Sequence, residues 1–381
     1  MSILSVFGGG TGGGTGGGTG GGTGGGTGGG TGGGTGGGTG ELGGLVAPWS
    51  PALAAALTQS RASLVGPFQG ATIRADLPEP LDKPERLAAW DVAPRMQICE
   101  LELFSGVRFD INQARDSVSL GFVDLDRKPL KNADLVTLVR PTEKVFKQQL
   151  ELVSNYAQLR EDRGNEVLTQ MVPQVPFWAS VIGLQAHRHK YTLELAALAL
   201  SFASHVEMRL KHAFACPRPV ELSPQIQPMI PTPGHSSWPS GHATEAFVTA
   251  TLLQALLQAA GRHGDRYEEQ LQRQAARIAV NRTVAGLHFP VDSAVGRLLG
   301  TAIGEFLVAR CAGNPKLPQR GFNGPKFQTP KGHVMDFDLR VSMADNESGY
   351  YQLLPGTNNV VASPLLAFMW DKAVKECQAL K

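Results

Sequence analysis

Three short blocks between residues 211 and 292 contain side chains suited to binding a tetrahedral oxyanion. The first block places Lys211 and Arg218 seven residues apart, which is about two turns along one face of a helix. Arginine binds phosphate-like groups through two parallel hydrogen bonds, and lysine acts as a point charge. Pro217 and Pro219 flank the arginine and stiffen the backbone that presents it. This block predicts a cationic site for an anion with several oxygens.

The second block is the sequence PSGH at residues 239–242, which runs directly into an Ala/Leu-rich segment that predicts a helix. The first turn of such a helix offers free backbone N–H groups and a positive dipole end to an anion. Gly241 lets the backbone approach closely, and Ser240 adds a hydroxyl group. His242 is placed to exchange a proton with the bound group.

The third block adds Arg282, His288 and Asp292. Asp292 follows His288 by four residues, close enough to accept one imidazole N–H and to fix the tautomer. The other ring nitrogen is then free to act as a nucleophile or as a metal ligand. This is the arrangement of a reactive base and the group that orients it.

Each of these features has an ordinary structural explanation when it is taken alone. A cation beside proline is usually a solvated loop charge, a Ser-Gly pair before a helix is usually a cap, and a lone histidine is usually structural. The three blocks in this order, each at a predicted helix terminus, are a much rarer combination. They therefore indicate a single site.

At these residues the chain resembles the family of type 2 phosphatidic acid phosphatases, bacterial non-specific acid phosphatases and vanadium-dependent haloperoxidases. Asn281 departs from the pattern, because many members carry serine there. The positions that match are Lys211, Arg218, Pro219, Pro239, Ser240, Gly241, His242, Arg282, His288 and Asp292.

The resemblance implies an all-α helical bundle that binds phosphate or vanadate. It implies that His288 attacks phosphorus or bonds to vanadium as the metal ligand, and that His242 is the acid–base catalyst. The implied ligands of the equatorial oxygens are Lys211, Arg218, Ser240, Gly241 and Arg282.

Two chemistries fit this signature, because vanadate mimics the transition state of phosphoryl transfer. His235, five residues before Ser240, is similar to an extra histidine of bromoperoxidases and is a candidate for binding or tuning halide. Its alternative is a solvent-facing loop histidine. The leading hypothesis is a vanadate-dependent haloperoxidase that oxidises halide with hydrogen peroxide. The alternatives are an acid phosphatase-type phosphomonoesterase that forms phospho-His288, and an assembly-forming structural protein that retains the anion pocket.

The apolar spacing predicts helices along most of the chain and a short hairpin between Cys99 and Asp126. Gly296, Gly300 and Gly304, spaced at four, predict a close helix contact. Helices are predicted over residues 51–64, 142–172, 176–187, 191–214, 243–260, 263–286, 291–313 and 363–381. The predicted domains are a Gly/Thr arm (1–40), a helical and loop region that packs on the core (41–170), the catalytic core (171–312) and a C-terminal extension (313–381).

Residues 8–39 are eight GGGT units, which hold 24 of the 47 glycines. One interpretation is a flexible linker. Another follows from the strand period of two, which puts every threonine on one face and only glycine on the other, so that such ribbons stack. We therefore hypothesise that residues 1–40 join subunits into a homo-oligomer or filament.

The composition argues against several classes of protein. The net charge of +2 and the 18% content of charged residues give no basic surface for nucleic acid. No apolar run reaches the length of a membrane span, and the first seven residues are too short for a signal-peptide core. These features predict a soluble enzyme that acts on a small-molecule substrate. They leave the compartment open, and an extracellular location is favoured if the protein forms filaments.

Overall fold

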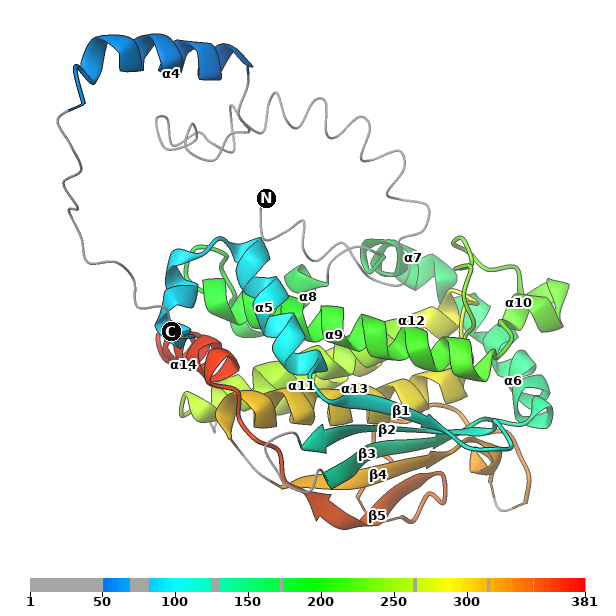
Figure 1. The fold of residues 1–381 in the computed structure, drawn as a ribbon. Coiled ribbons are helices and arrows are strands. Elements are labelled where there is room, and N and C mark those ends of the chain that lie inside the picture. The colour runs from blue at the N-terminus through cyan, green and yellow to red at the C-terminus, as the bar shows by residue number, and fades with distance from the viewer. Residues whose placement is uncertain are drawn as a thin grey trace. The chain divides into compact units, whose positions relative to one another are not determined.

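The computed structural model describes residues 51–68, 82–124, 131–171, 174–262, 266–313, 316–329, 331–344 and 346–380. These residues belong to two compact units. One contains helix α4 (Pro51–Leu64), whose side chains are all exposed, and the other contains the described residues from Lys83 onward (Figure 1). The predicted arm at residues 1–40 lies outside the described residues, so its assembly role stays a prediction, as do the domain boundaries.

Four long helices form the centre of the larger unit: α9 (Lys190–Phe214), α11 (Gly241–Ala259), α12 (Tyr267–Val284) and α13 (Pro290–Ala312). Helix α11 is apolar on nearly every side and is buried along most of its length. A helix with no polar face must be covered all round, and α9, α12 and α13 pack against it. The N-terminus of α11, which carries the PSGH block, therefore lies inside the protein.

The contact between α11 and α13 is the closest in this bundle. A Cβ atom built on Gly300 would lie 2.4 Å from the carbonyl oxygen of Thr244, and one on Gly296 would lie 2.7 Å from Cβ of Ala243. Only glycine permits this approach. The predicted close helix contact at the glycines is confirmed.

Shorter helices surround this centre. The predicted helix over residues 142–172 is divided, because the chain forms a 3₁₀ turn at Ala157–Leu159 between two α-helices. The α-helices are α5 (Val92–Phe104), α6 (Glu143–Tyr156), α7 (Arg160–Thr169), α8 (Val175–Ile182), α10 (Pro219–Leu222) and α14 (Pro364–Gln378). The 3₁₀ helices are η3 (Pro84–Ala89), η4 (Ala157–Leu159), η5 (Pro224–Ile226) and η6 (Gly324–Lys326).

The predicted all-α fold is wrong, because the larger unit also contains a five-stranded mixed sheet. The fold is α/β. In sheet order the strands are β1 (Val107–Ile111), β2 (Ser117–Asp124), β3 (Lys131–Val139), β4 (Leu317–Asn323) and β5 (Tyr351–Asn358). All neighbours are antiparallel except β3 and β4, which are parallel. The hairpin of β1 and β2 was predicted, although residues 99–104 belong to α5.

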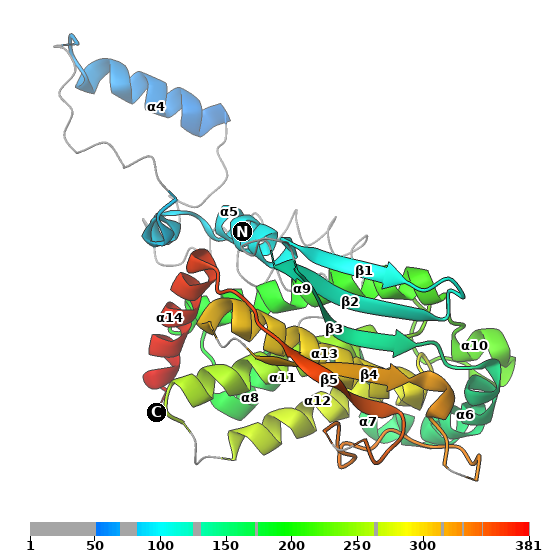
Figure 2. The same ribbon diagram turned by 60° about the horizontal axis from the view of Figure 1, so that its bottom comes forward.

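The sheet lies along one side of the helices, with α13 against it (Figures 1 and 2). Phe122 of β2 packs on Phe306 of α13 with ring centroids 5.3 Å apart. The hydroxyl of Tyr351 on β5 donates to the carbonyl oxygen of Ala294 at 2.9 Å. The sheet thus supports the helix whose first turn carries Asp292.

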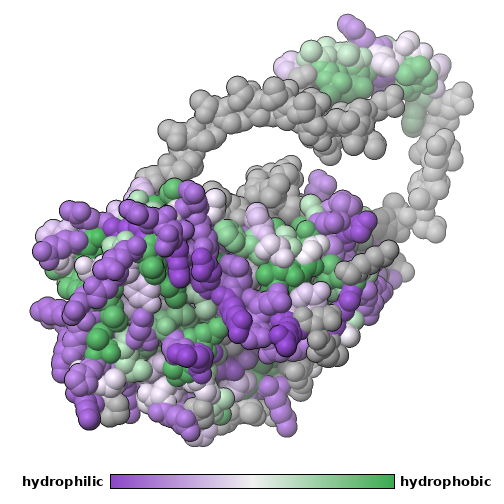
Figure 3. All heavy atoms as spheres, turned by 180° about the vertical axis from the view of Figure 1, so that it is seen from behind, coloured by the Kyte–Doolittle hydropathy of each residue, from purple (hydrophilic) through white to green (hydrophobic). Residues whose placement is uncertain are grey.

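Polar side chains cover much of the face seen from behind, with apolar patches between them (Figure 3). In the part of the chain that the structure describes, no helix combines the length and the apolar character that a membrane crossing requires.

Candidate active site

The three sequence blocks meet where the ends of four helices converge. Lys211 lies in the last turn of α9 and Arg282 in the last turn of α12. Ser240 is the N-cap of α11, and Asp292 lies in the first turn of α13. His288 lies in the short connection between α12 and α13. Because each block stands at a helix terminus, packing the four helices is enough to bring them together.

A small cavity of about 20 Å³ lies at this convergence. Its polar wall is formed by Arg218, His235, His242, Arg282 and His288. Its apolar wall is formed by Met171, Ile230, Pro231, Pro233 and Leu287. Five of the predicted site residues therefore line one cavity.

His288 is held at both ring nitrogens. Its Nδ1 lies 2.9 Å from Oδ2 of Asp292, which also accepts from the backbone N–H of Phe289. Its Nε2 lies 2.9 Å from Nη1 of Arg218. Because a guanidinium can only donate, Nε2 carries the lone pair and Nδ1 carries the proton. Burial, and next the charge of Arg218, lower the pKa of His288 well below its usual value, so the ring is neutral.

Arg218 is fixed by acceptors from two segments. Its Nε donates to the carbonyl oxygen of His235 and its Nη1 to that of Leu287, each at 3.0 Å. Its Nη2 lies 3.2 Å from Nδ1 of His235. Burial lowers the pKa of Arg218 to about 10, so the guanidinium keeps its charge at neutral pH.

His242 faces the cavity from the first turn of α11. Its Nε2 lies 3.0 Å from the backbone carbonyl oxygen of Gln170, which can only accept. The neutral ring therefore carries its proton on Nε2 and its lone pair on Nδ1. Burial, and next the charge of Arg282, lower the pKa of His242 to about 3. Nδ1 is thus the nitrogen left for acid–base chemistry.

Arg282 is buried beside His242. Its Nη2 donates to the carbonyl oxygen of Val167 and to Oε1 of Gln170, each at 3.1 Å. Its Nε is buried, and the described residues provide no hydrogen-bond acceptor for it. Burial lowers the pKa of Arg282 to about 10. A buried charged donor without an acceptor is a position that an anion can satisfy.

Lys211 does not line the cavity. Its Nζ donates to the backbone carbonyl oxygens of Ser236, Ser237 and Pro239, so the ammonium group holds the loop that precedes α11. Burial lowers the pKa of Lys211 to about 8. Its charge acts on the site from behind this loop rather than through a contact with the cavity.

Ser240 and Gly241 also lie behind the cavity wall. The hydroxyl oxygen of Ser240 accepts from the backbone N–H of Ala243 at 3.4 Å, which is a cap of α11. Asp292 is fully buried and reaches the cavity only through His288. The roles of Lys211, Ser240 and Gly241 as ligands stay predictions.

Two contact residues of the site carry no sequence signal. Gln170 and Met171 lie just after α7, about seventy residues before the PSGH block and inside no motif. Gln170 contacts both His242 and Arg282. Asn281, noted as a departure from the family pattern, donates to Oε1 of Gln170 at 3.0 Å.

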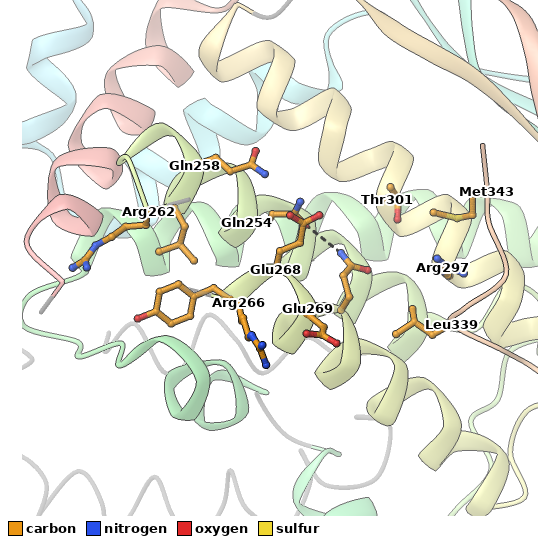
Figure 4. Close-up of a pocket in the computed structure, with 13 residues that line it drawn as sticks. Gln254, Gln258, Arg262, Arg266, Glu268, Glu269, Arg297, Thr301, Leu339 and Met343 are labelled. Carbon is orange, nitrogen blue, oxygen red and sulfur yellow. Dashed lines mark hydrogen bonds between the residues drawn. The ribbon is translucent and has the colours of Figure 1, made fainter. Parts of the chain in front are cut away.

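A larger cavity of about 770 Å³ lies elsewhere, between α11, α12, α13 and the segment at residues 339–343 (Figure 4). Its lining is rich in glutamine, arginine and glutamate, and Gln272 of α12 donates to Gln254 of α11 across it at 3.4 Å. The residues described around it include no histidine and none of the predicted site residues. The predicted site histidines therefore line the smaller cavity.

Residues 191–314 match the family model of the PAP2 superfamily. This segment belongs to the PAP2 superfamily. It spans α9 to α13, and so it contains all three blocks, whereas Gln170, the sheet and α14 lie outside it. No curated protein matches the chain. PAP2 superfamily members are generally phosphatases or haloperoxidases, which supports an enzyme of this broad type.

Proposed function

We propose that the chain is a phosphomonoesterase that works through a phosphohistidine at His288. The observation that carries this proposal is the neutral imidazole of His288, which Asp292 orients and whose Nε2 lone pair faces a cavity shared with His242 and two arginines. A neutral ring nitrogen is a nucleophile without prior loss of a proton. The opposing His242 is the group that can protonate a leaving oxygen.

In the first step Nε2 of His288 attacks phosphorus, and the ester P–O bond breaks. The leaving oxygen would take a proton from Nδ1 of His242. This step requires the charged ring, and a bound anion favours that form because it raises a histidine pKa. In the second step water attacks the phosphohistidine. Nδ1 of His242 accepts the proton of the water. The P–N bond breaks, its electron pair returns to Nε2 of His288, and inorganic phosphate leaves.

The arginines would bind the phosphoryl oxygens. Nε of Arg282 is a buried donor for which the described residues provide no acceptor. Arg218 would transfer its Nη1 hydrogen bond from His288 to the substrate. The charge of Lys211 and the N-terminus of α11 add to the positive potential. Donors fixed in advance stabilise the charge that develops on these oxygens.

Vanadate-dependent oxidation of halide is the second candidate. The same buried donors and the lone pair of His288 fit vanadate, which would be held by His288, Arg218 and Arg282 and would activate hydrogen peroxide when bound. The observation that favours this reaction is His235, which lines the cavity with its ring against Arg218. The observation against it is Met171 in the cavity wall, because a thioether is readily oxidised and a hypohalous product would form beside it.

Two assays on the full chain separate these candidates. The first measures hydrolysis of a chromogenic phosphate ester without vanadate, and the second measures bromination of a phenol-red-type dye with orthovanadate, bromide and peroxide. We expect hydrolysis that vanadate inhibits. Vanadate-dependent bromination without hydrolysis would overturn the phosphatase proposal and make His235 the next residue to substitute. Silence in both assays would favour the third hypothesis, an assembly protein that retains an anion pocket.

A further inference from the structure

Helix α7 ends against the polar wall of the cavity. After Thr169 the last carbonyl groups of this helix have no partner within the helix, which is the general situation at a helix C-terminus. Here two side chains of the site satisfy them: Arg282 donates to the carbonyl oxygen of Val167, and His242 to that of Gln170. The negative end of the helix dipole thus faces the cation of Arg282 and the ring of His242, which must be protonated in the proposed reaction.

The side chain of Gln170 completes this contact. It is buried, and its Oε1 accepts from Nη2 of Arg282 at 3.1 Å and from Nδ2 of Asn281 at 3.0 Å. Its Nε2 donates to Oε1 of Glu166 at 3.0 Å, and Glu166 is paired with Arg277 of α12. Gln170 therefore has a hydrogen-bond partner at each end of its amide and a fixed rotamer.

We propose that Gln170 is a positioning residue, which holds the guanidinium of Arg282 through its side chain and the tautomer of His242 through its backbone. The inference rests on the proposed function for its catalytic consequence but not for its geometry. Acceptors on Nη2 leave Nε of Arg282 as a buried donor available to an oxyanion. An acceptor on Nε2 of His242 leaves Nδ1 as the acid–base nitrogen.

Asn281 belongs to the same hydrogen-bond network. Its Oδ1 accepts from Arg163 of α7 at 3.3 Å while its Nδ2 reaches Gln170. A serine, which many superfamily members carry at this position, is shorter and has one oxygen in place of the amide's two polar ends. The departure from the family signature is thus matched by a partner, Gln170, that lies outside the segment matching the family model.

The direct test is nuclear magnetic resonance of the Arg282 side chain in the full chain. The two Nη nitrogens of a guanidinium give separate signals when its rotation is restrained and merge when it rotates freely, and Arg282→Lys assigns them by their loss. We expect separate signals in the parent protein and merged signals in Gln170→Met, which keeps the volume but removes the side-chain hydrogen bonds to Arg282, Asn281 and Glu166. Separate signals in Gln170→Met would overturn the proposal, whatever reaction the protein catalyses.

Two further variants control for packing. Gln170→Glu retains an acceptor for Arg282 but loses the donor to Glu166. The signals should stay separate if the acceptor is what restrains the guanidinium, while the added negative charge should weaken binding of inorganic phosphate. Gln272→Met makes the same chemical change on α12, where Gln272 contacts Gln254 away from the site, and should leave both measurements unchanged. Merged signals in Gln170→Glu as well would show that the acceptor is not what restrains Arg282.

The catalytic readout is a double-mutant cycle. Gln170→Met should lower kcat/KM for a phosphate ester by about 10- to 100-fold, the usual loss when a group that orients a ligand is removed. In the Arg282→Lys background the same substitution should change kcat/KM less than about threefold, because its effect passes through Arg282. Equal losses in both backgrounds would overturn the proposal. A parent protein with restrained Arg282 but no hydrolysis would overturn the proposed function and leave the positioning role intact.

Discussion

Arg218 donates from Nη1 to Nε2 of His288 across 2.9 Å, so a cation covers the nitrogen that would attack phosphorus. This contact keeps the ring neutral and its lone pair directed at Arg218 in the cavity wall. A bound phosphoryl group offers Arg218 a charged acceptor, which makes stronger hydrogen bonds than an imidazole nitrogen does. Substrate binding would therefore uncover the nucleophile and recruit the arginine in one exchange.

His288→Ala should abolish hydrolysis of phosphate esters, because the proposed covalent intermediate then has no attachment point. In the parent protein, rapid quenching during turnover should leave one phosphoryl group on the peptide that contains His288, detected by mass spectrometry. The fold and the oligomeric state should not change, as measured by circular dichroism and analytical ultracentrifugation.

His205→Ala is the matched control, because His205 is an exposed histidine of α9 outside the cavity, whose contacts are with Ser201 of its own helix and with Glu100 and Phe104 of α5. It should hydrolyse esters at the parental rate. Residual turnover in His288→Ala close to that of the parent, or a phosphoryl group on another residue, would contradict the assignment of His288. Loss of assembly in His288→Ala would instead indicate a structural role.

His242→Gln should slow hydrolysis according to the leaving group. A general acid contributes about 10²- to 10⁴-fold when the leaving oxygen is basic and much less when it is already a stable anion. An alkyl phosphate should therefore lose far more rate than a nitrophenyl phosphate, measured as kcat for both esters. An equal loss for the two esters would show that His242 does not protonate the leaving oxygen.

Loss of the positive charge of Lys211 should weaken anion binding above pH 8. Its pKa is lowered by burial from 10.5 to about 8, so the ammonium loses its charge as the pH rises through that value. Sulfate is a suitable probe because it keeps two negative charges across this range. Its affinity, measured by calorimetry, should fall by up to about tenfold per pH unit above 8.

The lowered pKa of Lys211 affects folding in the opposite direction, because it makes the folded state more stable as the pH rises. Between pH 8 and 10.5 the unfolded chain binds the Lys211 proton more tightly than the folded chain, so this residue makes folding more favourable as the pH rises through that window.

Lys211→Met is the control for sulfate binding. It should bind sulfate weakly, and its sulfate affinity should not fall above pH 8. Sulfate affinity that stays constant up to about pH 9.5 in the parent protein would show that Lys211 does not act on the anion.

The sequence predicted where the site residues lie better than it predicted the fold. Lys211, Ser240 and Arg282 stand at helix termini, as their spacing and the flanking apolar runs indicated. Helix ends can be read from local signals such as caps, prolines and the start of an apolar run. The contacts made by Gln170 could not, because they depend on how α7 packs against α12.

Strands β3, β4 and β5 of the sheet were missed for a related reason. Strand β3 pairs with β4, and Val136 lies opposite Arg320, a partner almost two hundred residues away. The buried part of β3 at residues 135–138 is a short, mostly apolar run. Periodicity alone does not distinguish such a run from a helix segment. The family resemblance, which covers only the helices from α9 to α13, then favoured an all-α interpretation.

Gly300→Ala tests whether the close helix contact positions the site. The new Cβ would lie 2.4 Å from the carbonyl oxygen of Thr244 on α11, and overpacking of this kind costs roughly 1–3 kcal/mol in the free energy of unfolding, measured with urea. Because α11 also carries His242, we expect a loss of kcat in addition. Gly164→Ala on α7 is the control, since its Cβ would meet only Cε of Met229, at 3.6 Å, and alanine favours a helix by about 1 kcal/mol over glycine. A stable, fully active Gly300→Ala protein would mean that α11 and α13 can separate without moving the acid–base histidine.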